Sequence, residues 1–169
     1  MKKWLLLLLA LLMCALPALG EVALEGDSAR LGDLVVIYQE DYSDPDSVAL
    51  YLHAFRELPP NYLTKAEARA RGWVSSEGNL WEVAWGMSIG GDVFGNREGL
   101  LPDDGERVWR ECDVNYYGGF RGGERVVYGS DGLIYYSDDH YGSFVELYDG
   151  WYEEESGDWL DWLGGWLEW

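Results

Sequence analysis

The sequence predicts an α+β fold in which N-terminal helices pack on a roughly five-stranded antiparallel β-sheet. Two observations support this class. Apolar residues recur at helical spacing between residues 44 and 84, whereas after residue 86 the chain consists of short β-rich runs separated by glycine-containing turns. Because helices that come first cover one face of a sheet formed afterwards, we expect the opposite face to be free to bind a ligand.

The N-terminal 43 residues are assigned to two segments. Residues 1–20, MKKWLLLLLALLMCALPALG, combine two lysines, a leucine run and small residues at Ala18 and Gly20. This order is typical of a secretory signal peptide cleaved before Glu21, so we expect a secreted, extracellular protein without membrane contact after cleavage. Residues 21–43 contain one apolar run, LVVIYQ, for which the sequence offers no clear partner, and we assign them to a linker or a pro-segment.

The chain is strongly acidic, with 31 aspartates and glutamates against 12 lysines and arginines and a formal net charge of −19. Removing the signal peptide takes away Lys2 and Lys3 and no acid, so ten cations would face 31 acids at a charge of −21. Such a charge repels polyanions at long range, which argues against a protein that coats RNA or DNA unspecifically. Cys112 would then be the one remaining cysteine, and we expect it to be a small buried core residue.

Three helices are expected before residue 86. The first spans residues 44–57: it follows helix-start chemistry, carries apolar residues at helical spacing and ends before two prolines. Thr64 and Glu67 form a capping box that opens the second helix, over residues 65–71. A third, shorter helical turn is expected over residues 79–84.

Five β-rich runs follow the helices, and the GSDG sequence between Tyr128 and Leu133 is the clearest hairpin signal among them. The runs are SIGGDVF, RVWRECDVNY, ERVVYG, LIYYS and SFVELY. Side chains alternate between the two faces of a strand, so Trp109, Glu111 and Asp113 share one face of the second run.

Two arginines add to this polar face. Arg121 and Arg125 lie in GGFRGGERVVY, and their parity places them with Glu111 and Asp113 if the strand extends back to Arg121. A surface with four such charges is not a hydrophobic core. Arginine binds planar oxyanions in a bidentate manner and also forms buried ion pairs. The sequence therefore leaves two alternatives open, a phosphate or carboxylate site and a structural cross-strand ion network.

His140, in the polar turn SDDHYGSF, is the better candidate for chemistry of the two histidines. A carboxylate and an imidazole that face two guanidinium groups supply the base, the acid and the charge neutraliser required for phosphoryl transfer to an internal hydroxyl. His53, in the first helix, is expected to be a surface residue. Asp138 and Asp139 precede His140, but no second histidine or cysteine lies at ligand spacing, so we expect neither a metal nor another cofactor.

Six runs stand in order within residues 44–148: YLTKAEARARGWV, GNLWEVAWGMSIGGDVFGNREGLLP, WRECDVNY, GFRGGERVVY, SDGLIYY and DHY. Together and in this order they resemble the characteristic segments of the secreted bacterial guanyl-preferring ribonucleases of the barnase and binase group. The resemblance implies that these residues form a ribonuclease domain with the microbial ribonuclease fold. It also implies a metal-independent endoribonuclease that cleaves single-stranded RNA 3′ of guanosine, by transesterification to a 2′,3′-cyclic phosphate and later hydrolysis.

The resemblance assigns catalytic roles to individual residues. Glu111 matches the general base that takes the proton from the ribose 2′-hydroxyl, and His140 matches the general acid that protonates the leaving 5′-oxygen. The cations that hold the phosphate and stabilise its charge match Lys65, Arg121 and Arg125. By the same resemblance Arg125 alternates between the phosphate and a structural ion pair with Asp113.

Guanine recognition in this family uses a loop whose backbone amides and one carboxylate contact the base edge. Here that loop comprises Phe94, Gly95, Asn96, Arg97 and Glu98. Tyr141 and His140 would flank the base from the other side. A site that hydrogen-bonds one base rejects bases that lack the matching groups. The family usually has a serine in place of Gly95, and because backbone amides contact the base we expect guanine preference to be weakened at most.

Partners follow from the same resemblance. We expect single-stranded RNA as the substrate, a barstar-like acidic inhibitor as a candidate protein partner, and a monomer. Functions of another class stay open as alternatives: a catalytically weak binding or toxin-like module, or carbohydrate binding through exposed tryptophans. We expect four tryptophans of the domain to be core or half-buried packing residues, namely Trp73, Trp81, Trp85 and Trp109.

The acidic, tryptophan-rich tail over residues 149–169 extends beyond the end of the family pattern. Three interpretations of the tail are open. The first is an amphipathic segment that packs on the domain. The second is an anchor that binds a surface, a carbohydrate or a partner, and the third is an acidic lid over the cationic site.

Overall fold

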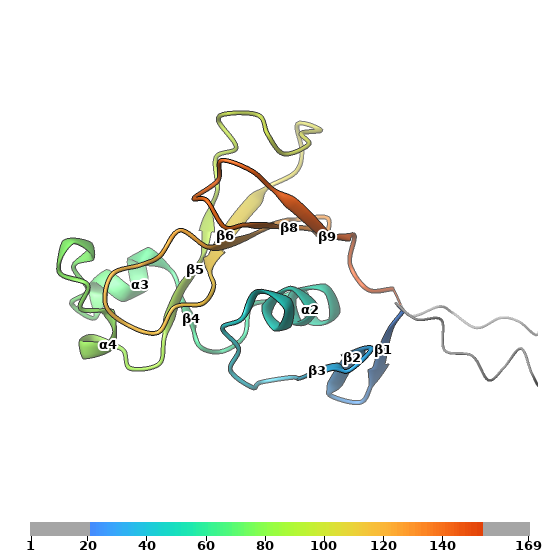
Figure 1. Ribbon diagram of the computed structural model, residues 1–169, viewed down its shortest axis with the longest axis horizontal. Coiled ribbons are helices and arrows are strands. Elements are labelled where there is room, and N and C mark those ends of the chain that lie inside the picture. Colours follow the sequence, from blue (N-terminus) through green and yellow to red (C-terminus); the bar gives the residue numbers. More distant parts are fainter. Residues whose placement is uncertain (1–20, 154–169) are drawn as a thin grey trace, which may run out of the picture.

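The computed structural model describes residues 21–153, and its architecture is α+β, as the sequence predicts (Figure 1). In chain order the elements are β1 (Val22–Glu25), β2 (Ser28–Leu31), β3 (Leu34–Ile37), α2 (Pro45–Phe55), β4 (Tyr62–Leu63), α3 (Lys65–Ala70), η1 (Ser75–Glu77), α4 (Leu80–Val83), β5 (Ser88–Val93), β6 (Trp109–Asp113), β7 (Arg125–Gly129), β8 (Leu133–Ser137) and β9 (Val145–Asp149). The predicted signal peptide and residues 154–169 of the tail lie outside the described residues. No helix within residues 21–153 is both long and apolar enough to cross a bilayer.

A six-stranded sheet with the order β4-β5-β6-β7-β8-β9 forms the centre of the molecule. Neighbouring strands from β5 to β9 pair antiparallel, and the predicted GSDG hairpin joins β7 to β8. The sixth strand, β4, is two residues long and pairs parallel with β5. Figure 1 shows the sheet close to edge-on, with α2 against one face and β1–β3 beyond α2.

Helix α2 packs between two layers of β-structure. Asp44 caps its first turn by accepting a hydrogen bond from the amide of Ser47, 2.9 Å away, and Arg56 ends it in the left-handed conformation. Towards the sheet the helix buries its Val48–Ala49 turn in a cluster with apolar side chains of β6, β7 and β8. Cys112 lies in this cluster at 1% exposure, which confirms the prediction that it is a buried core residue.

Residues 21–43 form a three-stranded antiparallel sheet, β1-β2-β3, where the sequence suggested a linker or pro-segment without a partner. The partner is the outer face of α2: Ala29 and Val36 pack with Leu50 and Tyr51 in one fully buried cluster. The sequence did not reveal this contact because helix α2 is apolar on two sides. One side faces the six-stranded sheet, and the other is covered by residues 21–43, which lie outside the family pattern. Whether residues 21–43 are removed in a maturation step stays a prediction.

Helices α3 and α4 pack against the other end of the sheet and form a second core cluster around Trp73, Leu80, Ile89 and Tyr116. The expected packing role holds for Trp73 and Trp109, which are 5% and 4% exposed, and for the half-buried Trp81. It is wrong for Trp85, which is 80% exposed.

The start of the tail docks on the domain. The carbonyl oxygen of Gly150 lies 2.7 Å from Nδ1 of His53, and the amide of Tyr152 donates to the carbonyl of His53 at 2.9 Å. The ring of Tyr148 stacks on His53 at 4.3 Å between centroids. His53 is therefore half-buried between α2 and residues 148–152, and the expectation of a surface residue is wrong.

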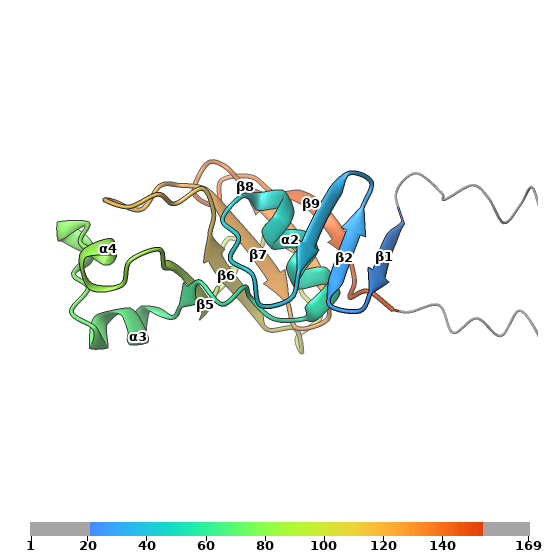
Figure 2. The same cartoon turned by 90° about the horizontal axis from the view of Figure 1, so that it is seen from below.

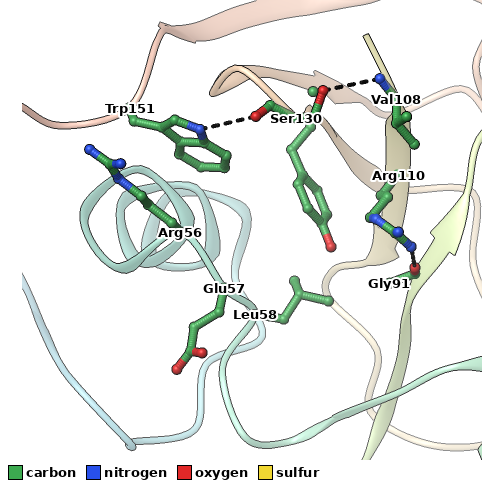
Figure 3. Close-up of a pocket in the computed structure, with 10 residues that line it drawn as sticks. Arg56, Glu57, Leu58, Gly91, Val108, Arg110, Ser130 and Trp151 are labelled. Atoms are coloured by element: carbon green, nitrogen blue, oxygen red, sulfur yellow. Dashed lines mark hydrogen bonds between the residues drawn. The ribbon is translucent and has the colours of Figure 1, made fainter. Parts of the chain in front are cut away.

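Trp151 lines an open pocket of about 420 Å³ on the α2 side of the sheet (Figure 3). Its indole nitrogen donates to the carbonyl of Ser130 at 3.3 Å, and Leu58 and Arg110 line the opposite wall. Gly132 makes this docking possible, because a Cβ there would lie 2.2 Å from the Trp151 amide nitrogen. The cavity is separate from the polar face of the sheet: Arg110 precedes Glu111 on β6, so the two side chains point to opposite faces.

Candidate active site

The face of the sheet opposite α2 carries the charged residues that the sequence singled out. Asp113 on β6 pairs directly with Arg125 on β7, and Glu111 pairs with Val127. Glu111, Asp113 and Arg125 are 6%, 1% and 3% exposed. The face is not free over its whole extent as expected, because Trp109 and Val127 are covered by an aromatic cluster from the loops after β5 and β8.

Asp113 binds both arginines. Arg121 donates from Nε and Nη2 to the two Asp113 oxygens at 2.5 and 2.6 Å, and Arg125 Nε lies 3.0 Å from Oδ1. Burial disfavours the charged form of Arg121, but the hydrogen bonds to Asp113 outweigh this and raise the pKa of its guanidinium. The structural ion network is thus present, and it holds two cations with one carboxylate.

Glu111 lies beside this network and is bound by Lys65 and Tyr141. Lys65 Nζ is 2.5 Å from Oε1, and the Tyr141 hydroxyl donates to Oε2. Burial alone would raise the pKa of Glu111, but the hydrogen bonds from Lys65 and Tyr141 and the charges of Lys65 and Arg121 lower it below its ordinary value. Glu111 is therefore an ionised carboxylate, the form that can accept a proton.

Helix α3 positions Lys65 as its first residue. The predicted capping box is confirmed: Thr64 accepts a hydrogen bond from the amide of Glu67 at 3.2 Å, and Glu67 accepts one from the amide of Thr64 at 2.8 Å. The amide of Lys65 itself donates to Asp92 on β5 at 2.8 Å. The helix start is fixed to the sheet, so the ammonium group reaches Glu111 from a defined position.

His140 lies in the loop between β8 and β9. Its backbone φ is 58° and that of Tyr141 is 74°. Both residues are thus in the left-handed conformation, which residues other than glycine seldom adopt. Asp139 holds the turn by accepting hydrogen bonds from the amides of Gly142 and Ser143 at 2.8 and 2.9 Å. The imidazole is exposed, and its centroid lies 4.8 Å from that of Tyr141. The strained turn thus presents an accessible imidazole beside the tyrosine that binds Glu111.

The loop expected to recognise guanine follows β5 and is organised by Asn96. The Asn96 side chain donates to the carbonyl of Leu101 at 2.8 Å and accepts from its amide at 3.1 Å. Three further residues of the predicted loop, Gly95, Arg97 and Glu98, are exposed. The ring of Phe94 lies 4.9 Å from that of Tyr141, so this loop and the His140 loop meet at Tyr141.

Two contacts in this site were not predicted from the sequence. Tyr141 was expected only to flank a base, yet its hydroxyl joins Glu111 and accepts a hydrogen bond from Arg125 Nε at 3.1 Å. Asp92 was not singled out, although it fixes the backbone of Lys65. A tyrosine next to His140 was the available signal for the first contact; the second depends on the placement of α3 on the sheet. Within residues 21–153 no three histidine, cysteine or acidic side chains are arranged to hold a metal ion.

Comparison with known proteins assigns the family. The family model described as ribonuclease matches residues 46–148, which run from the first turn of α2 into β9 and include every residue of the candidate site. The chain belongs to the ribonuclease family. The matched region excludes β1–β3 and the residues that dock after β9, so both are additions to the family domain in this chain.

Three relatives illustrate the family. A ribonuclease from Heyndrickxia coagulans is 58% identical over 102 residues, which is 60% of this chain and 94% of the relative. A ribonuclease from Bacillus intermedius has the same identity over 102 residues, 63% of its length. The guanyl-specific ribonuclease St of Saccharopolyspora erythraea is 47% identical over 55 residues, 32% of this chain and 54% of that protein.

Proposed function

We propose that this ribonuclease-family protein is a secreted endoribonuclease that cleaves single-stranded RNA 3′ of guanosine without a metal ion. The observation that carries the proposal is the buried, ionised carboxylate of Glu111, which lies between Lys65 and Tyr141 and beside a network with two guanidinium groups and one carboxylate. Membership of the family and the name of the Saccharopolyspora relative support the reaction and the base preference.

In the first step Glu111 accepts the proton of the ribose 2′-hydroxyl, and the 2′-oxygen attacks phosphorus. The P–O5′ bond breaks, and the His140 imidazolium donates its proton to the leaving 5′-oxygen, which gives a 2′,3′-cyclic phosphate. In the second step water opens the cyclic phosphate, with His140 as base and Glu111 as acid. Lys65, Arg121 and Arg125 bind the non-bridging oxygens, whose negative charge increases in the transition state.

Guanine preference is assigned to the loop of residues 94–98. Its backbone amides and the Glu98 carboxylate would bind the base edge, with Phe94 and Tyr141 forming one aromatic wall. The exposure of Gly95, Arg97 and Glu98 leaves this edge accessible.

The test is cleavage of a short RNA that contains one guanosine, with a chelator present. The expected result is a single cut 3′ of the guanosine with a cyclic phosphate end. Glu111→Gln and His140→Gln should each lower kcat about 10²- to 10⁴-fold, whereas Asp138→Asn, an exposed change in the same loop as His140, should leave it unchanged. Full activity of both the Glu111 and His140 variants would overturn the proposal, and no cleavage by the unaltered protein would favour the binding-module alternative.

A further inference from the structure

Three aromatic side chains, Trp85, Tyr117 and Phe120, form an exposed group that we call the aromatic ledge. They are 80%, 68% and 72% exposed, more than any other large hydrophobic side chain in the described part of the chain. Exposed aromatic groups gathered in one place are typical of surfaces that bind a partner. Neither the site chemistry nor the fold uses these three rings.

The ledge rests on rigid support. The Trp81 ring lies 4.9 Å from that of Trp85, and its indole nitrogen donates to the carbonyl of Met87 at 2.9 Å. The 117–120 loop lies directly on Trp81, because a Cβ at Gly118 would be 2.9 Å from the indole ring. The Tyr116 hydroxyl, from the core, donates to the carbonyl of Gly119 at 2.9 Å. The rings are thus presented from a fixed surface, which lowers the entropic cost of binding.

The loop that carries two of the ledge residues leads directly to the candidate active site. Phe120 directly precedes Arg121, which binds Asp113 and whose guanidinium lies 6.0 Å from the ring centroid of Trp73. Tyr117 and Trp81 line one small cavity together with Gly86. Gly86 directly follows Trp85 in the chain. Figures 1 and 2 both show the loop between β6 and β7 beside α4, at the end of the molecule away from α2 and β1.

Charge decides which partner fits. A chain of net charge −19 attracts the phosphates of an RNA strand poorly outside its local cationic site. Base stacking on aromatic rings does not depend on that attraction, and it tolerates any sequence because each base has a flat π-face. Exposed rings on the loop that leads to Arg121, and on the segment packed beside that loop, therefore match the part of a single strand that leaves the site.

We propose that Trp85, Tyr117 and Phe120 are stacking subsites for bases of single-stranded RNA beyond the cleaved guanosine step. This inference rests on the proposed ribonuclease function and extends it to the binding of long substrates. Affinity for the strand would come from stacking at the ledge, and the cations at the site would bind only the phosphate that reacts.

The test compares three substrates: a guanylyl dinucleotide, a single strand of about ten nucleotides with one guanosine, and the same strand with abasic residues around the guanosine step. Trp85→Leu, Tyr117→Leu and Phe120→Leu should each raise KM for the long strand about fivefold or more and leave the dinucleotide unchanged. Trp85→Phe, which keeps a ring, should restore most of the loss. The abasic strand should bind weakly to the unaltered protein and show no further loss in the leucine variants.

Tyr38→Leu is the matched control. Tyr38 is a 40% exposed aromatic residue directly after β3, on the other side of α2, so its loss should not change KM for either substrate. Unchanged KM for the long strand in all three leucine variants, or an equal rise for the dinucleotide, would overturn the proposal and leave the ledge to a protein partner. If the unaltered protein cleaves nothing, the proposed function fails separately, and anisotropy of a labelled strand still tests whether the leucine variants lose RNA binding.

Discussion

The guanidinium of Arg121 forms two hydrogen bonds with the carboxylate of Asp113, at 2.5 and 2.6 Å. Because Arg125 binds the same carboxylate, the cluster keeps one positive charge in excess although the chain as a whole is strongly negative. The Arg121 side chain is 18% exposed against 3% for Arg125, so its guanidinium is the more accessible of the two to solvent. Asp113 is thus the shared counterion that fixes both guanidinium groups.

Replacing this counterion should destabilise the fold. Asp113→Asn removes the charge that compensates two guanidinium groups, one of them almost completely buried, and we expect a loss of about 3–5 kcal/mol in the free energy of unfolding. Urea denaturation measures it. Asp138→Asn, at an exposed position without a salt bridge to a described residue, should change stability by less than about 0.5 kcal/mol. Equal stability of the two variants would show that the Asp113 cluster does not stabilise the fold.

Tyr141→Phe should move the acid limb of the pH profile of kcat/KM to higher pH. The Tyr141 hydroxyl donates to Glu111 and is one of the causes that lower the pKa of this carboxyl. Without that hydrogen bond the pKa of Glu111 rises, so the base loses its proton only at a higher pH. A profile measured on a guanylyl dinucleotide tests this, and an unchanged or lower acid limb would contradict the role assigned to the hydroxyl.

Thr64→Ala should remove the N-cap of α3. The expected loss is about 1 kcal/mol in the free energy of unfolding, because the amide of Glu67 then lacks its acceptor. The start of the helix also carries Lys65, so KM for the dinucleotide should rise as well. Ser75→Ala is the matched control, since Ser75 is an exposed residue at the start of η1, where Val74 and not Ser75 is the N-cap. A Thr64 variant as stable as this control would argue against the capping role.

His53 should make stability fall as the solution is acidified. Burial lowers the pKa of His53, and this outweighs the raising effects of the Gly150 carbonyl and of Asp149. The unfolded chain therefore binds a proton at a higher pH than the fold does, so stability is full above about pH 6.5 and decreases as pH falls towards the lowered pKa. In His53→Gln the loss of stability between about pH 7.5 and about pH 5.5 should be smaller.

NMR titration of the imidazole protons gives an independent measurement, because the chain has only two histidines. A pKa of His53 at or above the ordinary value of about 6.5 would contradict the burial argument.

Local patterns were sufficient to predict the elements that form the site. Alternation along β6 placed Glu111 and Asp113 on one face, and the two residues at Thr64 and Glu67 predicted the start of α3. Both signals act within one strand or one helical turn, so a single sequence contains them. The hairpin after Tyr128 was predicted for the same reason.

The features that the sequence did not predict depend on contacts between distant segments. The β1–β3 sheet is stable because it packs on Leu50 and Tyr51 of α2, a side of the helix that its own spacing does not distinguish from the side facing β6. Trp85 was expected to be a packing residue. It contacts the ring of Trp81, but the loop at Gly118 also lies on that ring, and the Trp85 side chain stays exposed. The capture of Arg121 by Asp113 likewise depends on how the 118–124 loop closes over the sheet.

Glu21 and Glu153, the two ends of the described chain, line one shared cavity beside β1, whereas α3 lies at the far end of the molecule in both views (Figures 1 and 2). A short linker could therefore join Glu21 to Glu153. New chain ends could then be placed at the exposed residues 103–106, which lie between β5 and β6. The result would be a circular permutant in which no strand of the sheet is cut. For the same reason a bead or a fusion partner attached at Glu21 or Glu153 would hold the enzyme with its candidate active site facing outwards.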